Sequence, residues 1–231
     1  MGSAIRTADA TAARWVTIAT VSTPAASSGP SPRANRQRLS ADQRRGQVFA
    51  ATADAIAATG YANVTLTEVA RRAGIAKGLV WHYFSDRDDL MQQTLAHLGH
   101  VIRDAVVDDL EVSAPAPDVV REVIRRTALL TRTHRAELDA MAQIVQSLRT
   151  SDGRQRITVR AYDATYGEHQ RRLARGQAEG TIRPADPRVM AVIYQGAIDA
   201  MISYLQDHPE VDPEVEAQAV ADVLLSGFTA R

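Results

Sequence analysis

The sequence predicts an all-α protein of about nine helices, and three observations support this prediction. Beyond residue 40, apolar residues recur every three or four positions, which is the spacing of an amphipathic helix. Capping residues precede several of these stretches, and Gly or Pro follows them. No stretch alternates apolar and polar residues as a half-buried strand does. The helices are expected at about 40–59, 66–73, 76–84, 86–112, 118–133, 136–149, 154–179, 187–206 and 213–228.

The first 38 residues are expected to form a disordered basic arm. They are rich in Ala, Ser, Thr and Pro and have no periodicity. Residues 1–45 hold seven arginines against two aspartates, although the whole chain has a net charge of zero. This asymmetry favours a polyanionic partner near the N-terminus, and we expect Arg33, Arg36 and Arg38 to reach DNA. A solvated tail explains the charge equally well.

Residues 65–84 have the pattern of a helix-turn-helix. Thr65, followed three residues later by Glu68, has the capping-box spacing that opens a helix, and Gly74 ends that helix. The second short helix begins at Lys77 and Gly78, where a cation and bare backbone can approach DNA closely. The second helix of such a motif lies in the major groove and reads base edges with its N-terminal residues.

Four aromatic side chains follow one another from Trp81 to Phe84. With 100° per residue, Val80 and Phe84 point inward, Tyr83 lies at the margin, and Trp81 and His82 point outward. The three rings outside the core each have an N–H or O–H group that can donate to a phosphate oxygen. The alternative is that all the rings simply pack a helical hairpin. We expect the inward pair to contact a small core of Phe49, Ala70 and Ile75.

The segment VFAATADAIAATGYANVTLTEVARRAGIAKGLVWHYFSDRDDL resembles the DNA-binding domain of the TetR (tetracycline-repressor-like) family. The resemblance runs from about Asp42 to Ile102 and includes the stop at Gly60 and the hydrophobic residue Leu90. It implies a domain at 39–102, a helical effector-binding and dimerisation domain at 103–231, and a DNA-binding homodimer. The DNA contacts that the resemblance implies are Thr65, Thr67, Ala76, Lys77, Gly78, Leu79, Trp81, His82, Tyr83 and Arg87.

Four of these positions depart from the family pattern. Ala76 stands where Ser or Thr is usual, Trp81 replaces a common Tyr, and Leu79 fills a place often held by a small or polar residue. These three departures affect which operator is read, and not whether DNA is bound. Arg87 replaces a usual Lys, and from the first turn of its helix we expect it to reach phosphate.

The C-terminal part is expected to hold the dimer interface. Small and apolar residues recur at helical spacing on its last two helices, and two such helices from each subunit can form a four-helix interface. Packing within one chain explains any single residue of this set equally well. The candidate interface residues are Gly196, Ala197, Ala200, Val220, Val223, Leu224 and Gly227.

A candidate ligand site lies on the helix expected at 154–179. Tyr162, Tyr166 and His169 stand at i, i+4 and i+7, and Met141 and Gln143 on the preceding helix are expected to face them. A mostly apolar cavity with a few polar groups suits a small hydrophobic molecule. The alternative for each residue is ordinary core packing.

The remaining signals argue against other classes of protein. The chain has no cysteine, and no nucleophile elbow, phosphate loop or metalloprotease motif is present, so we expect neither an enzyme nor a cofactor. His97 and His100 have metal-ligand spacing with Asp104 nearby, but exposed histidines are far commoner and we predict no metal. No apolar run approaches the roughly 20 residues of a membrane span.

The sequence therefore predicts a cytoplasmic, nucleoid-associated transcriptional regulator. We expect a homodimeric repressor that binds a palindromic or pseudo-palindromic operator in double-stranded DNA. A small hydrophobic molecule of unknown identity is expected to release it from the operator. The alternative is an architectural DNA-binding protein without an effector.

Overall fold

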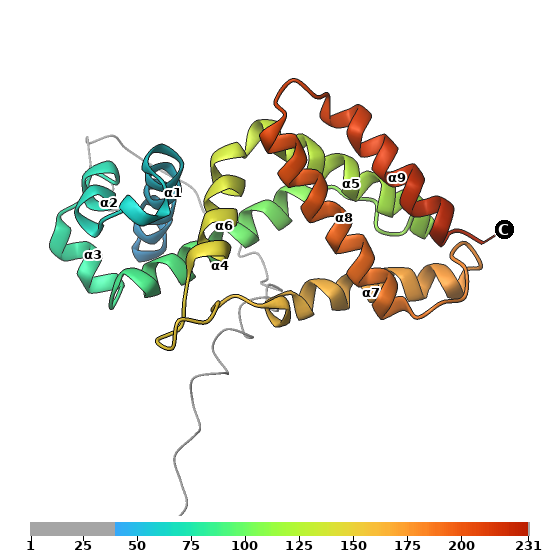
Figure 1. Ribbon diagram of the computed structural model, residues 1–231, viewed down its shortest axis with the longest axis horizontal. Coiled ribbons are helices and arrows are strands. Elements are labelled where there is room, and N and C mark those ends of the chain that lie inside the picture. Colours follow the sequence, from blue (N-terminus) through green and yellow to red (C-terminus); the bar gives the residue numbers. More distant parts are fainter. Residues whose placement is uncertain (1–39, 231) are drawn as a thin grey trace, which may run out of the picture.

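The computed structural model describes residues 40–230, without the side chain at position 159. In this part of the chain nine α-helices and two short 3₁₀ helices, η2 and η3, are joined by loops, which confirms the all-α prediction (Figure 1). The expected arm, residues 1–38, lies outside the described residues. The elements are α1 (Ala41–Thr59), η2 (Tyr61–Asn63), α2 (Leu66–Arg72), α3 (Lys77–Tyr83), α4 (Arg87–Val107), α5 (Ala116–Thr133), α6 (Arg135–Ser147), η3 (Val159–Tyr162), α7 (Asp163–Ala178), α8 (Pro187–Asp207) and α9 (Pro213–Phe228).

The helices pack around two hydrophobic cores. Figure 1 shows α1–α3 at one end of the molecule, α5 and α7–α9 at the other, and α6 between them. Val48, Val69 and Leu90 belong to the first core, to which α6 adds the fully buried Ile144. The second core contains Ile124 of α5 and buried residues of α7, α8 and α9. Because α6 contributes to the first core, the two halves of the molecule share a packed contact.

The domain boundary expected near residue 102 falls inside the continuous helix α4. The first part of α4 buries Leu98 in the first core, whereas Val106 is buried in the second. The boundary is therefore a change of packing partner along one apolar stripe, without a linker.

Helix α4 ends at Val107, five residues before the end that the sequence predicts. The guanidinium of Arg126 on α5 donates to the carbonyl oxygens of Val106 (3.2 Å), Asp108 and Asp109 (3.4 Å). Asp109 also adopts a left-handed conformation, with φ of 53°. Because these carbonyl groups are capped by Arg126 of α5, the sequence near Val107 does not indicate that α4 ends there.

The helix predicted to start near residue 154 begins only at Asp163. Before it, the amide of Thr150 donates to Arg154 O (2.8 Å) and the amide of Arg156 donates to Leu148 O (3.0 Å). The turn between them uses Gly153 with φ of +81°. The β-branched residues at 157–159 also disfavour a helix, so the prediction was wrong over its first nine residues.

Candidate nucleic-acid interface

Helix α2 begins with half of the predicted capping box. The hydroxyl of Thr65 accepts from the amide of Glu68 (3.2 Å). The carboxylate of Glu68 instead pairs with Arg71 and Arg72, each at 2.6 Å. Hydrogen bonds from these two guanidinium groups lower the pKa of Glu68 to about 2. Both arginines of α2 are thus engaged with an acidic neighbour.

The turn between α2 and α3 requires glycine. Gly74 has φ of +65°, a region that residues with a side chain rarely adopt. The turn is closed by the amide of Ile75, which donates to Ala70 O at 3.0 Å. Ile75 packs against the first core, and this contact sets the direction in which α3 leaves the turn.

Helix α3 is anchored by the two residues that the helical angle predicts. Val80 is fully buried, Phe84 is 1% exposed, and the Phe84 ring packs edge-on against Phe49 with the ring centroids 5.7 Å apart. Tyr83 is half-buried, whereas Trp81 is 49% exposed and His82 is also exposed. The predicted division of the aromatic run into an anchor and a displayed side is confirmed.

Most of the predicted DNA-contacting residues lie on the exposed surface of α2 and α3. Lys77 is exposed and has no ion pair within the described part of the chain. Ala76 gives α3 no side-chain cap, so the first turn of this helix begins without an internal hydroxyl partner. The exposed members of the set are Thr65, Thr67, Ala76, Lys77, Gly78, Trp81 and His82, and the half-buried members are Leu79, Tyr83 and Arg87.

Arg87 is held against the protein and does not project from this surface. Its Nε donates to Val64 O at 3.1 Å, and its Nη2 donates to Tyr61 O. The guanidinium carbon lies 4.3 Å from the centroid of the Tyr61 ring, in a cation–π contact. The phosphate contact expected of Arg87 competes with these three interactions.

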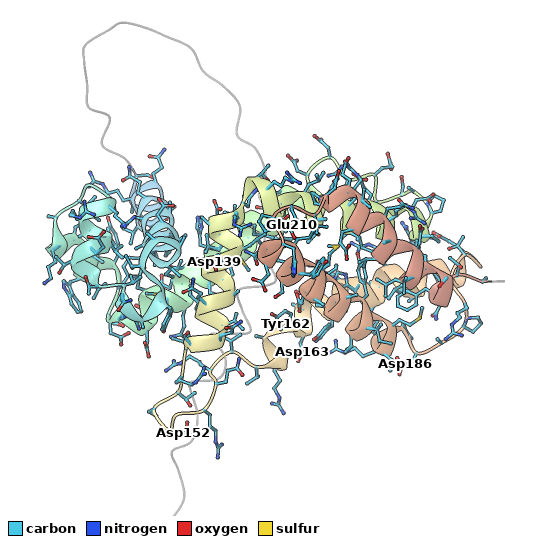
Figure 2. All side chains as sticks on the ribbon, turned by 45° about the horizontal axis from the view of Figure 1, so that its top comes forward. Asp139, Asp152, Tyr162, Asp163, Asp186 and Glu210 are labelled. Atoms are coloured by element: carbon cyan, nitrogen blue, oxygen red, sulfur yellow. The ribbon has the colours of Figure 1, made fainter. Side chains whose placement is uncertain are left out.

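Tyr61 is also held from the other side, by α6. Its amide donates to Oε1 of Gln143 at 2.8 Å, and Nε2 of Gln143 donates to Asp139 at 3.0 Å. Figure 2 shows Asp139 on α6, next to the α1–α3 end of the molecule. We call Tyr61, Arg87 and Gln143 the Tyr61 clamp. Sequence reasoning missed it because Gln143 lies 82 positions from Tyr61, and no local pattern links them.

The structure does not bring Met141 and Gln143 to the tyrosines and histidine of the predicted ligand site. Met141 packs against the first core, and Gln143 belongs to the Tyr61 clamp. These two residues therefore do not belong to this candidate site, because α6 turns this face toward the α1–α3 end.

The other three members of that set stay together on η3 and α7. The rings of Tyr162 and Tyr166 are 6.0 Å apart, and Figure 2 shows Tyr162 at the start of α7. His169 is buried, and its Nε2 lies 2.9 Å from Oε1 of Gln195 on α8. Its ring also packs edge-on against Tyr194 with the centroids 4.5 Å apart, a neighbour that the sequence pattern did not reveal.

The predicted dimer residues lie along one face of α8 and α9. Leu224 is 8% exposed, Val223 is 74% exposed, and a shallow open groove runs between the two helices. Ala197, Ala200, Val220, Val223 and Leu224 from the predicted set line the groove, with Met201, Tyr204, Glu216 and Ala219. Gly196 and Gly227 are also exposed. The face is extended by the exposed side chains of Val189, Ile193 and Val215.

Two further features are absent from the described residues. Among residues 40–230, no helix is long and apolar enough to cross a membrane. The same residues contain no group of three or more His, Asp or Glu side chains that could hold a metal ion. His97 instead stacks on Phe49, with the ring centroids 4.8 Å apart.

Helix α3 is anchored by Val80 and Phe84 and displays Lys77, Trp81 and His82. With α2 and the turn between them it forms a helix-turn-helix, a motif of DNA-binding proteins. Residues 48–94 match the family model described as bacterial regulatory proteins, tetR family. This match covers the end of the chain from α1 into α4, which is therefore similar to the DNA-binding part of these regulators.

A curated relative is similar over part of its length. The HTH-type transcriptional regulator BetI of Klebsiella pneumoniae (strain 342) is 40% identical over 67 residues, which are 29% of this chain. The chain covers about a third of that relative, 34% of its length.

Solved structures extend the likeness in fold. The transcriptional regulator FadR from Bacillus subtilis, in complex with stearoyl-CoA, has a TM-score of 0.68 at 21% identity and covers 79% of this chain and 98% of its own. A TetR-family transcriptional regulator (HI0893) from Haemophilus influenzae has a TM-score of 0.62 at 16% identity and covers 82% and 98%. Identities this low show a common fold for both halves of the molecule.

Proposed function

We propose that this protein is a homodimeric transcriptional repressor that binds a palindromic operator through α3 and is released by a small hydrophobic effector. The observation that carries the proposal is the surface of α3. Lys77 and the rings of Trp81 and His82 are exposed there. Burial of the large Trp81 ring would stabilise the fold, so its exposure suggests a binding role. A large exposed ring behind an unpaired cation suits contact with DNA phosphates and base edges. Binding to chromosomal DNA would place the protein at the nucleoid.

The dimer is proposed to form through the exposed face of α8 and α9. One recognition helix reads too few base pairs for specificity, and a two-fold dimer places two such helices on a palindrome. The face combines small residues, Gly196 and Ala200, with exposed apolar residues such as Val223. Small residues let two helices approach closely, and apolar ones gain free energy when they are covered.

The Tyr61 clamp is proposed to couple the two halves. Gln143 stands on α6, whose C-terminal turns pack into the core of the DNA-binding end. An effector that moves α6 changes the position of Tyr61, and with it the α2–α3 unit. Operator affinity falls when the two recognition helices can no longer reach both half-sites together.

The proposal is tested by selecting bound fragments from a pool of random double-stranded DNA. The expected result is one palindromic sequence with a fixed half-site spacing. Trp81→Ala should bind this sequence with an affinity lowered by about 1–3 kcal/mol, the range for a lost base-edge contact, and should still form dimers in analytical ultracentrifugation.

Enrichment of many unrelated sequences would overturn the proposal and favour the architectural DNA-binding protein. Unchanged affinity of Trp81→Ala would contradict the proposed role of Trp81 in the DNA contact. Arg183→Gln, an exposed substitution on the loop before α8, is the matched control and should leave the affinity unchanged.

A further inference from the structure

A row of polar side chains crosses the contact between α7 and α8. Arg172 Nη1 lies 3.3 Å from Nδ1 of His169, and Nε2 of His169 lies 2.9 Å from Oε1 of Gln195. Nε2 of Gln195 then donates to Asp199 at 2.8 Å. Arginine can only donate and an ionised aspartate can only accept, so every bond of the row has a fixed direction. His169 therefore accepts at Nδ1 and donates at Nε2.

Near His169, the Tyr194 hydroxyl and the remaining N–H groups of Arg172 have no acceptor among the described protein atoms. Tyr194, whose ring packs on His169, is 1% exposed, and its hydroxyl has no hydrogen-bond partner in the described structure. Arg172 is half-buried, and within residues 40–230 no carboxylate lies within salt-bridge distance of it. Buried hydroxyl groups without partners are costly and rare, so one that persists calls for an explanation.

The charge at this end of the row is positive. Burial raises the pKa of the Tyr194 hydroxyl, and the charge of Arg172 acts in the opposite direction. Burial also lowers the pKa of His169 to about 4, and the charge of Arg172 adds to this effect. Asp199 acts instead on Tyr162 and Tyr166, whose pKa values it helps to raise. The acidic and basic ends of the row are thus separate.

We propose that Tyr194 and Arg172 form the binding site for the carboxylate group of the effector. The carboxylate accepts from the Tyr194 hydroxyl and from the N–H groups of Arg172 that His169 leaves free. The apolar body of the effector packs among the neighbouring side chains of the second core, such as Leu173 and Ile198. This inference rests on the proposed effector-responsive function and assigns the effector a chemical class, that of a carboxylic acid with an apolar body.

The basis of the assignment is the chemistry of the donors. A guanidinium group and a hydroxyl with no internal acceptor favour an anionic oxygen, because charge-assisted hydrogen bonds are about twice as strong as neutral ones. An amine would meet a like charge at Arg172, and an alcohol offers neither negative charge nor a second acceptor oxygen. The site should therefore discriminate by the head group of the ligand more than by its chain.

The test uses the full-length dimer and three probes of equal chain length: octanoate, 1-octanol and octylamine. Isothermal titration calorimetry should detect octanoate and should show binding of the other two at least about tenfold weaker. Tyr194→Phe and Arg172→Gln should each weaken octanoate binding by about tenfold or more, whereas Arg172→Lys should restore part of it. Arg171→Gln, the exposed neighbour on α7, is the matched control and should bind as the wild type does.

Each other outcome overturns the inference. Absence of octanoate binding, equal binding of octanol, or wild-type affinity in both Tyr194→Phe and Arg172→Gln would exclude a carboxylate site here. Circular dichroism of each variant separates lost binding from lost folding, and Tyr194→Phe keeps the buried ring. DNA binding is measured in parallel, so a protein that binds its operator but does not bind octanoate refutes this inference alone. Octanoate binding without any operator binding would refute the proposed function and leave the site.

Discussion

Replacing Gln143 by methionine tests whether the Tyr61 clamp sets the position of the DNA-binding end. Methionine has nearly the same length and shape as glutamine, but it cannot accept the Tyr61 amide in the same way or donate to Asp139. The wild-type bonds are 2.8 Å and 3.0 Å long. Loss of the first bond leaves a partly buried amide unpaired, which costs about 1–3 kcal/mol. For a chain of this length each kcal/mol lowers the melting temperature by roughly 2–4 °C.

The informative readout is the dependence of DNA affinity on half-site spacing. In the wild type, moving the half-sites apart by one base pair should lower affinity by about tenfold or more, because both recognition helices must engage together. Gln143→Met frees η2 from α6, so the α2–α3 unit can follow the displaced half-site and the loss should be smaller. Fluorescence anisotropy on the selected operator and on its two spacing variants measures this difference.

The control is Gln146→Met, the same substitution one turn later on an exposed position of α6. It should leave both the melting temperature and the spacing profile unchanged. If Gln143→Met lowers the melting temperature but keeps the wild-type spacing profile, the clamp stabilises the fold without positioning the DNA-binding end.

Three further predictions concern stability and assembly. In Gly176→Ala the added methyl collides with Ile182 Cγ1 and lies 2.7 Å from Cβ of Ala116, so we expect a loss of about 1–3 kcal/mol in thermal unfolding. The pKa of His169 is about 4 in the folded state and 6.5 in the reference state, so only the unfolded chain binds this proton between those pH values. The free energy of unfolding should therefore fall by about 3 kcal/mol as pH drops from 6.5 to 4, and His169→Gln should flatten that slope in denaturant titrations. Val223→Asp places a charge on the exposed α8–α9 face and should shift sedimentation from dimer to monomer.

Matched substitutions separate these effects from general damage. Gly99→Ala on α4 meets no atom within 4 Å and should stabilise the protein by about 1 kcal/mol, the opposite sign to Gly176→Ala. His82→Gln, at an exposed position, should leave the pH slope as in the wild type. Val107→Asp, an exposed valine at the end of α4, should leave the dimer intact. A monomer in the Val107 variant, or a dimer in the Val223 variant, would contradict the proposed interface.

The sequence was sufficient where short-range geometry decides the structure. The angle of 100° per residue placed Val80 and Phe84 inward and Trp81 outward, because α3 is regular and one side of it faces a core. Gly74 was recognised as a helix end, since the turn needs a positive φ. The same reasoning predicted α9 with both ends correct, from Pro213 to Phe228.

Long-range contacts explain where the sequence predictions were wrong. Arg126 of α5 donates to the carbonyl groups at the end of α4. Tyr61 forms hydrogen bonds with Arg87, 26 positions away, and with Gln143, 82 positions away. The sequence around Arg87 or Gln143 would look the same whether the side chain contacted DNA, an effector or a neighbouring loop. The unpaired Tyr194 was equally hidden, because a lone tyrosine in an apolar helix looks like ordinary core.

The central claim is that the exposed surface of α3 binds DNA, and Lys77 tests it most directly because it is the single lysine of the sequence. The measurement is the affinity of wild type and Lys77→Gln for the selected operator at several salt concentrations, with Arg183→Gln as control. If Lys77 contacts a phosphate, Lys77→Gln should bind more weakly at every salt concentration, and the slope of log affinity against log salt should be smaller by about one. An unchanged affinity and slope in Lys77→Gln would contradict the account.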